Sequence, residues 1–151
     1  LEARLGGGLP LSACVGPDRI MDAWPPSRGE AIHTSTFLGN PLACATAIAS
    51  IELLLSQPWA RTVQRLNLQL EEGLSPARKL PQVKEVRTLG AIGVIELHEP
   101  VDMTRVQPMF VERGVWVRPF GRLVYAMPPY IMGEQDIATL TSAMVEVAGQ
   151  I

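Results

Sequence analysis

The sequence has few of the side chains that build metal centres and disulfides. Its 151 residues include two cysteines, Cys14 and Cys44, and two histidines, His33 and His98. The cysteines form no CxxC motif, and neither histidine has a partner at the spacing of metal ligands. We therefore expect no metal site. The cysteines are more typical of two buried, reduced thiols in a cytosolic protein than of a disulfide.

The sequence also has no large excess of charge of either sign. Lys and Arg together number 13 against 15 Asp and Glu, which gives a net charge of -2. This balance argues against nucleic acid or an anionic membrane surface as the main partner. Any site that binds an anion must therefore be local. With 47% hydrophobic and 19% charged residues, the chain can bury a core and is not expected to be disordered.

No segment has the length and composition of a membrane span. The longest apolar stretch, residues 37–55, is interrupted by Asn40, Pro41 and Glu52, whereas a span needs about 20 mostly apolar residues. The chain starts at Leu1, without the basic start and apolar core of a signal peptide and without an initiating methionine. We therefore expect no membrane partner, and we interpret Leu1 as the edge of a fragment.

Two consecutive helices are expected in the middle of the chain. Asn40 and Pro41 provide an N-cap and a first-turn proline for a helix over residues 41–55. A second start signal at residues 56–58 precedes an amphipathic helix that ends near Gly73. The buried face of this second helix is expected to contain Trp59, Val63, Leu66 and Leu70.

Strand signals appear beyond residue 80. Residues 83–97 contain two β-rich runs separated by Leu89 and Gly90, which predict two strands with a bend or bulge between them. Residues 114–119 and 122–127, GVWVRP and RLVYAM, predict two further strands. A small antiparallel sheet covered by helices is the simplest arrangement of these segments.

Two more helices complete the second half of the chain. Asp102 is the expected cap of a helix that runs to Arg113 and stops at Gly114, and Pro108 indicates that this helix starts late or is kinked. A final helix over residues 134–149 has an apolar face. That face consists of Ile137, Leu140, Met144 and Val147. The order of elements predicts an α+β fold for the second half.

A long loop rich in hydroxyl groups, residues 25–41, precedes the first of these helices. Loops longer than about 12–15 residues within compact domains are usually functional or disordered. Thr34, Ser35 and Thr36 with nearby backbone N–H groups could cradle a phosphate. The alternative is a serine/threonine turn that satisfies its own backbone. The glycine run at residues 6–8 lacks the GxGxxG or Walker spacing and is a weak phosphate signal by itself.

Two arginines, Arg118 and Arg122, lie in the otherwise apolar residues 114–131. Burying a fixed positive charge without a partner costs several kcal/mol, to order of magnitude. Either these arginines face water on a surface strand, or Arg118 binds an anion that is not part of the protein. A guanidinium offers a planar fork that matches a carboxylate. Three aromatic residues near it would form an apolar wall: Trp116, Phe120 and Tyr125.

Three blocks of sequence resemble one family. HTSTFLGNPLACA (33–45), VRTLGAIGVIEL (86–97) and GVWVRPFGRLVYAMPPYI (114–131) are similar to the C-terminal third of class III pyridoxal-phosphate aminotransferases. The last block is narrower and most similar to the members that act in biotin synthesis. The resemblance covers essentially the whole chain and implies an α/β to α+β fold, the C-terminal portion of a fold-type-I transferase. Residues 1–56 would end the large cofactor-binding domain, and residues 57–151 would form the small domain with an antiparallel sheet and helices.

The resemblance implies roles for five residues. Thr36 would bind the phosphate of pyridoxal 5'-phosphate held by the neighbouring subunit, with Ser35 beside it. Thr34 would lie near the substrate. Arg118 would bind the substrate carboxylate, and Tyr125 would line the same pocket.

The same resemblance shows a departure at the start of the chain. In class III enzymes, the lysine that binds the cofactor covalently lies three residues before the glycine run, and here Ala3 takes that position. Arg4 cannot replace the lysine because a guanidinium does not deprotonate to an amine nucleophile. We therefore assign no catalytic residue and expect this chain alone to be inactive.

The resemblance implies a cytoplasmic homodimer that transfers an amino group between small molecules, from S-adenosylmethionine to a keto acid. Two alternatives stay open. Ala3 favours a truncated or diverged homologue that is kept for binding or dimerisation. Another class III aminotransferase is the second alternative, because biotin-synthesis members usually have Gly-Pro where this chain has Thr34 and Ser35.

Overall fold

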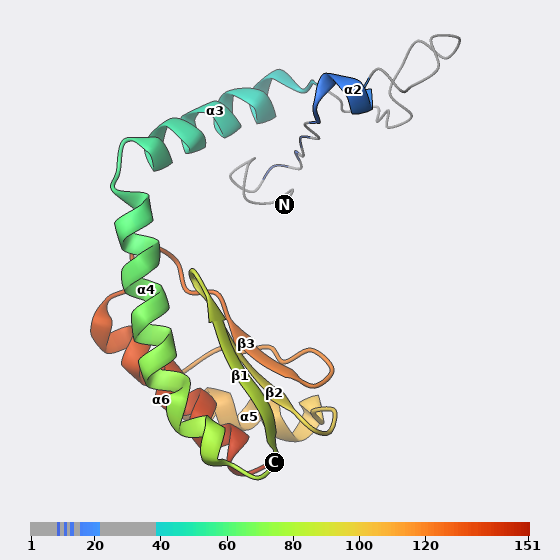
Figure 1. The fold of residues 1–151 in the computed structure, drawn as a ribbon, viewed down its shortest axis with the longest axis vertical. Coiled ribbons are helices and arrows are strands. Elements are labelled where there is room, and N and C mark those ends of the chain that lie inside the picture. The colour runs from blue at the N-terminus through green and yellow to red at the C-terminus, as the bar shows by residue number, and fades with distance from the viewer. Residues whose placement is uncertain (1–8, 10, 12, 14–15, 22–38) are drawn as a thin grey trace. The chain divides into compact units, whose positions relative to one another are not determined.

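The chain divides into two compact units, Leu1–Gln57 and Pro58–Ile151 (Figure 1). The structure is a computed structural model, and it describes residues 9, 11, 13, 16–21 and 39–151. The glycine run at residues 6–8 and most of the hydroxyl-rich loop, residues 25–38, therefore lie outside the described residues, as does Cys14.

The first unit contains two described helices, α2 (Asp18–Met21) and α3 (Pro41–Leu55). Helix α3 begins where the sequence predicts it. The Asn40 side-chain oxygen accepts hydrogen bonds from the backbone N–H groups of Leu42, at 3.0 Å, and Ala43, at 3.2 Å. Both amides would otherwise be unsatisfied in the first turn, so the cap fixes the start of the helix.

Helix α3 is apolar on all sides rather than on one face. Its buried side chains are those of Ala43 and Ala47, and Cys44 is a free, half-buried thiol. Its exposed large hydrophobic side chains are Leu42, Ile48, Ile51, Leu53, Leu54 and Leu55. A helix that is hydrophobic all round is normally covered all round. The described residues leave most of α3 uncovered.

The second unit opens with helix α4 (Trp59–Leu74), which begins after Pro58. The start signal predicted at residues 56–58 directly precedes this helix, but Ser56 does not cap it. The Ser56 hydroxyl donates to the backbone oxygen of Leu53 at 2.8 Å and so belongs to the end of α3. Trp59, expected on the buried face, is 43% exposed. The buried face consists of Leu66, Leu70 and Leu74.

A 3-10 helix that the sequence did not predict, η2 (Ser75–Lys79), leads into an antiparallel sheet of three strands. The strands are β1 (Val83–Leu89), β2 (Ile92–Leu97) and β3 (Leu123–Ala126), in the order β1-β2-β3. The first two form a hairpin that turns at Gly90, whose φ of 58° is the left-handed conformation that glycine adopts readily. The two strands predicted within residues 83–97 are confirmed.

The register of the sheet separates a core face from an outer face. Val86 pairs with Ile95, and Ile95 pairs with Val124, so these three side chains form one buried row. The outer face carries charges instead: Glu96 accepts from Lys84 at 2.7 Å and from Arg87 at 2.6 Å. The helices therefore pack on one face of the sheet.

Helices α5 (Met103–Glu112) and α6 (Glu134–Ala148) follow. Helix α5 begins directly after Asp102, whose carboxylate accepts from the Thr104 N–H at 3.0 Å, and it continues through Pro108. It does not start late. The core joins residues of all these elements: Leu74, Val86, Ile95, Val106, Phe110, Val124, Met144 and Val147.

Helices α4 and α6 pack against each other as well as against the sheet (Figure 1). The two helices approach closely at Gly73. A Cβ atom built there would lie 2.7 Å from the Cβ atom of Thr141, which is closer than real side chains approach. The absence of a side chain at Gly73 therefore sets the spacing of the two helices.

The prediction of a strand over residues 114–119 is wrong. In the described part of the chain, residues 114–119 are extended and form no ladder with β3. One isolated bridge, between Phe120 and Leu123, comes directly after them. Val117 and Pro119 are buried, whereas the residues between and beside them are exposed. Alternation of this kind reports burial on one side, and an extended segment achieves that burial without ladder hydrogen bonds.

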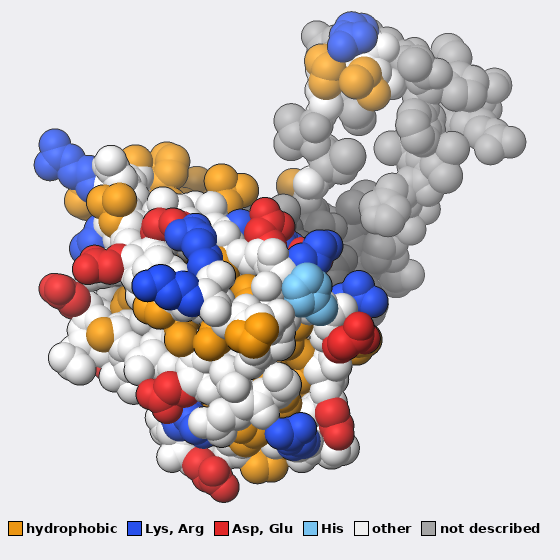
Figure 2. Space-filling model, turned by 60° about the horizontal axis from the view of Figure 1, so that its bottom comes forward, with side chains coloured by type: hydrophobic (Ala, Val, Ile, Leu, Met, Phe, Trp, Pro, Cys, Tyr) orange, Lys and Arg blue, Asp and Glu red, His pale blue; other side chains and the backbone are white. Residues whose placement is uncertain are grey.

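On the face shown in Figure 2, Lys and Arg side chains are interspersed with Asp and Glu side chains. Within the described residues, no single helix is long and apolar enough to cross a membrane. Two consecutive helical segments with a bend between them, Pro41–Leu55 and Trp59–Lys79, are together long and apolar enough, by length and composition only.

Candidate functional site

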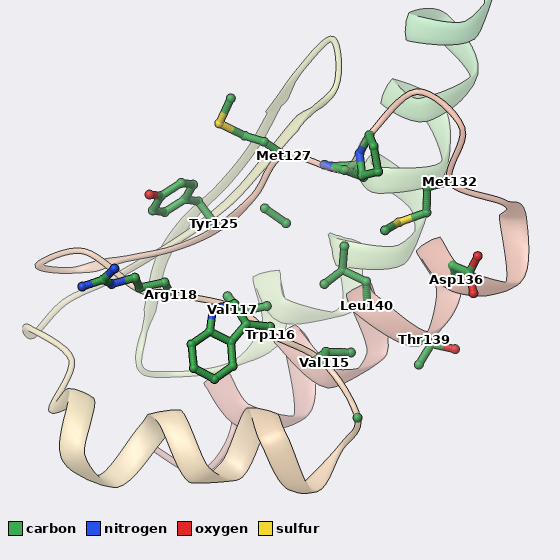
Figure 3. A pocket seen from close by; sticks show the side chains of 14 residues that line it. Val115, Trp116, Val117, Arg118, Tyr125, Met127, Met132, Asp136, Thr139 and Leu140 are labelled. Carbon is green, nitrogen blue, oxygen red and sulfur yellow. The ribbon is translucent and has the colours of Figure 1, made fainter. Parts of the chain in front are cut away.

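A hollow of about 530 Å³ lies beside β3 in the second unit (Figure 3). Three parts of the chain form it: the extended segment after α5, the end of β3 with the loop that follows, and the first turns of α6. Most of its lining is apolar: Val115, Trp116, Val117, Ala126, Met127, Pro128, Pro129, Met132 and Leu140. This size and lining are typical of sites for small organic ligands.

The extended segment is held at both of its ends. At the first, Gly114 adopts a φ of 72° and ends α5, and the Val115 N–H donates to the backbone oxygen of Phe110 at 3.1 Å. At the second, Phe120 and Leu123 exchange two backbone hydrogen bonds of 2.9 Å. The segment between them therefore presents alternate side chains inward and outward at fixed positions.

The structure brings together two of the residues that the sequence predicted for the site. Arg118, from the extended segment, and Tyr125, from β3, both line the hollow, and Figure 3 shows their side chains at the same end of it. The other three predicted residues, Thr34, Ser35 and Thr36, lie outside the described residues.

The expected aromatic wall is only partly present. Trp116 and Tyr125 line the hollow, but Phe120 does not. Phe120 sits at the bridge that closes the segment, where its side chain is 76% exposed. Its assignment to the wall is therefore wrong for this hollow.

Several lining residues were missed from the sequence. Met127 directly follows β3, so the alternation of that strand could have indicated it. Met132 and Leu140 come from the loop before α6 and from α6 itself, and only the packing of α6 brings them here. Asp136 and Thr139, also from α6, lie at the end of the hollow opposite Arg118 (Figure 3).

Helix α4 holds the loop that forms one wall of the hollow. Arg65 donates through Nη2 to the backbone oxygen of Met132 at 3.2 Å, and Nη1 donates to the Gln69 side chain at 2.7 Å. Pro128 and Pro129 restrict the same loop further, because each ring fixes its backbone φ. The wall is therefore shaped before any ligand binds.

Of the cationic side chains in the described part of the chain, that of Arg118 lines this hollow. Among the described residues, no carboxylate lies within ion-pair distance of its guanidinium. A guanidinium has five N–H donors in a planar fork. It can therefore donate two parallel N–H hydrogen bonds to one carboxylate, which is the strong bidentate arrangement for this pair.

The hollow offers no amine for covalent binding of a cofactor. The chain has two lysines, Lys79 and Lys84, and neither lines it. Lys84 instead pairs with Glu96 on the outer face of the sheet. Among the described residues, no group of three or more His, Cys, Asp or Glu side chains could hold a metal ion.

The fold and this hollow define the C-terminal portion of an aminotransferase. Comparison of sequence with known families agrees: the family Aminotransferase class-III matches residues 3–148. The chain therefore belongs to the class III aminotransferases, and the fold-class prediction is confirmed.

Two curated relatives of this chain carry the same name. The adenosylmethionine-8-amino-7-oxononanoate aminotransferase of Mycobacterium leprae is 47% identical over 151 residues, covering 99% of this chain and 35% of the relative. The enzyme of the same name from Corynebacterium glutamicum is 40% identical over 145 residues, with 95% and 34% covered. The chain thus spans about a third of the length of the curated relatives it matches.

Solved structures agree. The crystal structure of adenosylmethionine-8-amino-7-oxononanoate aminotransferase from Methanocaldococcus jannaschii has a TM-score of 0.81 and 27% identity, covering 97% of this chain and 37% of that one. The ornithine aminotransferase of Toxoplasma gondii has a TM-score of 0.77 and 29% identity, with 97% and 35% covered. That structure has partial occupancy of pyridoxal phosphate at its active site.

Proposed function

We propose that this chain is the substrate-recognising, C-terminal part of an aminotransferase of biotin synthesis, which transfers an amino group from S-adenosylmethionine to 8-amino-7-oxononanoate. The observation that carries the proposal is that Arg118 and Tyr125 line one hollow with an apolar wall. The names of the relatives supply the two substrates.

In this proposal Arg118 binds the carboxylate of the keto acid. A carboxylate at the end of a long alkyl chain needs a charged partner at one end of its site and apolar surface along the rest. The hollow provides the guanidinium at one end and the side chains of Met127, Met132 and Leu140 farther along. Tyr125, beside Arg118, adds a phenol that can donate a hydrogen bond.

The cofactor in this proposal is pyridoxal 5'-phosphate, which supplies the electron sink for the amino transfer when bound. The hollow itself does not fit covalent binding of that group, because it has no lysine. We propose that Ser35 and Thr36 bind its phosphate, with Thr34 near the substrate. Residues 1–56 would then belong to the cofactor-binding domain and residues 57–151 to the small domain.

Two broader properties belong to the same proposal. A homodimer is proposed because Thr36 is expected to act on the cofactor of a neighbouring subunit, and two-fold dimers are the commonest oligomers. A cytoplasmic location is proposed because Cys44 is a free thiol, as is usual in reducing compartments.

The test is binding of 8-amino-7-oxononanoate to the chain, measured by calorimetry. Replacing Arg118 with alanine should raise the dissociation constant roughly thirtyfold, about 2 kcal/mol, the lower end of what a desolvated charge pair loses. Arg122→Ala is the matched control, because Arg122 lies in the same stretch but does not line the hollow. An unchanged dissociation constant for Arg118→Ala would sink the assignment.

One observation favours a second candidate, a binding or dimerisation module without activity: Ala3 stands where the cofactor-binding lysine is expected. Treatment of the chain with pyridoxal phosphate and borohydride, followed by peptide mass spectrometry, separates the candidates. We expect no specific adduct on Lys79 or Lys84, the two lysines of the chain. A specific adduct on either lysine would show that the chain binds the cofactor covalently at another position, and it would remove the support for this candidate.

A further inference from the structure

The outward face of the extended segment carries an unusual set of side chains. Trp116, Arg118 and Phe120 alternate with the buried Val117 and Pro119, so the first three point to the same side. Trp116 is 75% exposed and Phe120 is 76% exposed. Two large aromatic side chains therefore flank the guanidinium, and both stand mostly in solvent.

Exposure of a large aromatic ring needs an explanation when the backbone around it is fixed. Tryptophan is highly buried on average, and it is enriched where an apolar ring meets a ligand or partner. The segment that carries Trp116 is anchored at Val115 and at Phe120, as described above, so its exposure does not come from a loose chain end. Of the two flanking rings, only that of Trp116 lines the hollow.

We propose that the Trp116 indole stacks on the adenine of the amino donor while Arg118 binds the carboxylate of the same molecule. This proposal rests on the proposed function, because it takes S-adenosylmethionine as the donor. It adds a residue that tells donor from acceptor: the donor carries a purine, and 8-amino-7-oxononanoate has no aromatic ring.

The spacing of the two side chains suits such a ligand. Residues two apart in an extended segment are about 6.6 Å apart along the backbone and share a face. The methionine part of S-adenosylmethionine links its carboxylate to the nucleoside through a chain of single bonds, so the two ends can reach neighbouring side chains. Within this chain, which spans about a third of its relatives, both Trp116 and Arg118 are open to solvent, so no described residue blocks the approach of a nucleoside.

Stacking on tryptophan also suits the electronic character of the ligand. Adenine presents a flat π face, and base–aromatic stacking tolerates many orientations along the ring. The positive sulfonium next to the nucleoside could instead face the ring. The two contacts predict different results with donor analogues, so a binding experiment can separate them.

The experiment measures binding of four compounds to the chain and to Trp116→Ala: S-adenosylmethionine, methionine, S-methylmethionine and 8-amino-7-oxononanoate. The substitution should weaken S-adenosylmethionine about tenfold, or about 1.4 kcal/mol, within the range found for base–aromatic stacking. Binding of the other three should change less than twofold. Trp116→Phe should keep part of the affinity for S-adenosylmethionine.

Trp59→Ala is the matched control, because Trp59 is also partly exposed but lies on α4 and does not line the hollow. It should leave all four affinities unchanged. Equal weakening of S-methylmethionine would show that the ring faces the sulfonium, and it would overturn the stacking proposal. Equal loss for all four compounds would give Trp116 a packing role and also overturn it.

The outcome is separable from that of the proposed function. If the keto acid binds through Arg118 and Trp116→Ala leaves S-adenosylmethionine binding intact, the stacking proposal fails while the proposed function stands. If the unchanged chain binds the keto acid but not S-adenosylmethionine, the stacking proposal and the donor named in the proposed function both fail, while the assignment of the keto acid to Arg118 stands. If the keto acid does not need Arg118, the proposed function fails first.

Discussion

Arg118 and Arg122 show how two identical side chains, four positions apart, differ in their surroundings. Arg118 lines the hollow, whereas Arg122 lies in the turn before β3, where its backbone oxygen accepts from the Leu97 N–H at 2.9 Å. The sequence placed both in one apolar run and could separate them only by family resemblance. The physical difference comes from the turn closed by Phe120 and Leu123, which directs the two residues differently.

The surroundings of Glu71 predict a dependence of stability on pH. Its carboxylate accepts from Arg78 at 2.6 Å and from the Thr88 hydroxyl at 2.9 Å, which ties α4 to η2 and β1. These hydrogen bonds, the one from Arg78 first, hold the pKa of Glu71 below its ordinary value of 4.5. A lowered pKa in the folded state means stability that is fully present above pH 4.5 and is lost as pH falls through the folded value.

Glu71→Gln should therefore lower the melting temperature most at neutral pH, and the difference should shrink below pH 4.5. Because the pair is largely exposed, we expect only about 1–3 °C, and less in high salt. Scanning calorimetry between about pH 3 and pH 7, a range that includes the ordinary pKa of a glutamate, would check this. Glu72→Gln is the control. A difference that stays constant over the whole range would contradict the role of Glu71.

At the scale of elements, the sequence predicted best where the determinants are local. Asn40 and Asp102 cap their helices as expected, since a capping side chain reaches only two or three residues along the chain. The strand over residues 114–119 was wrong because alternation does not distinguish an extended segment from a paired strand. The 3-10 helix η2 was missed, although Pro76 in its first turn was a signal for a helical start.

Contacts between elements could not be predicted from the sequence. Nothing near Gly73 indicates that Thr141 will lie against it, and nothing near Met132 indicates that it will line the same hollow as Arg118. Both depend on where α6 packs. Two residues named by the family resemblance, Arg118 and Tyr125, line the hollow, and the sequence missed the lining residues that the packing of α6 supplies.

Gly73→Ala is the prediction at this scale. The added methyl group would meet the buried Thr141, so α4 and α6 must move apart or repack. Overpacking of this kind costs about 1–3 kcal/mol, even though alanine favours a helix more than glycine does. Urea unfolding would measure the loss. Gly133→Ala is the control, because the nearest atom to a Cβ there is 3.6 Å away, and a Gly73→Ala variant as stable as the parent would refute the close approach.

The whole molecule carries an imbalance between its two units. The second unit has a continuous core under its sheet, whereas α3 in the first unit shows apolar side chains on all sides. Exposed apolar surface of this extent marks an interaction surface or a tendency to aggregate. Because the chain spans about a third of its curated relatives, α3 is a surface to be covered in any complete assembly.

We therefore expect the chain, studied alone, to self-associate through α3 as its concentration rises. Replacing Leu53 and Leu55 together with glutamine should reduce this association, since both side chains are more than 60% exposed. Sedimentation velocity over a range of concentrations would measure it. Leu68→Gln on α4, where the leucine is 63% exposed, is the control. A chain that stays monomeric at every concentration would contradict the expectation.

The hydrogen bond from Arg65 to the backbone oxygen of Met132 also has a consequence for how the second unit folds. It joins groups 67 residues apart and so encloses the whole sheet in one loop of chain. The hairpin of β1 and β2 closes a far shorter loop, whose entropic cost is smaller. The sheet should therefore form before the hydrogen bond between Arg65 and Met132, called the clamp below. The rate-limiting barrier to folding should be crossed before the clamp has formed. The clamp then mainly lowers the rate of unfolding and has little effect on the rate of folding. It therefore lengthens the lifetime of the loop that forms one wall of the hollow.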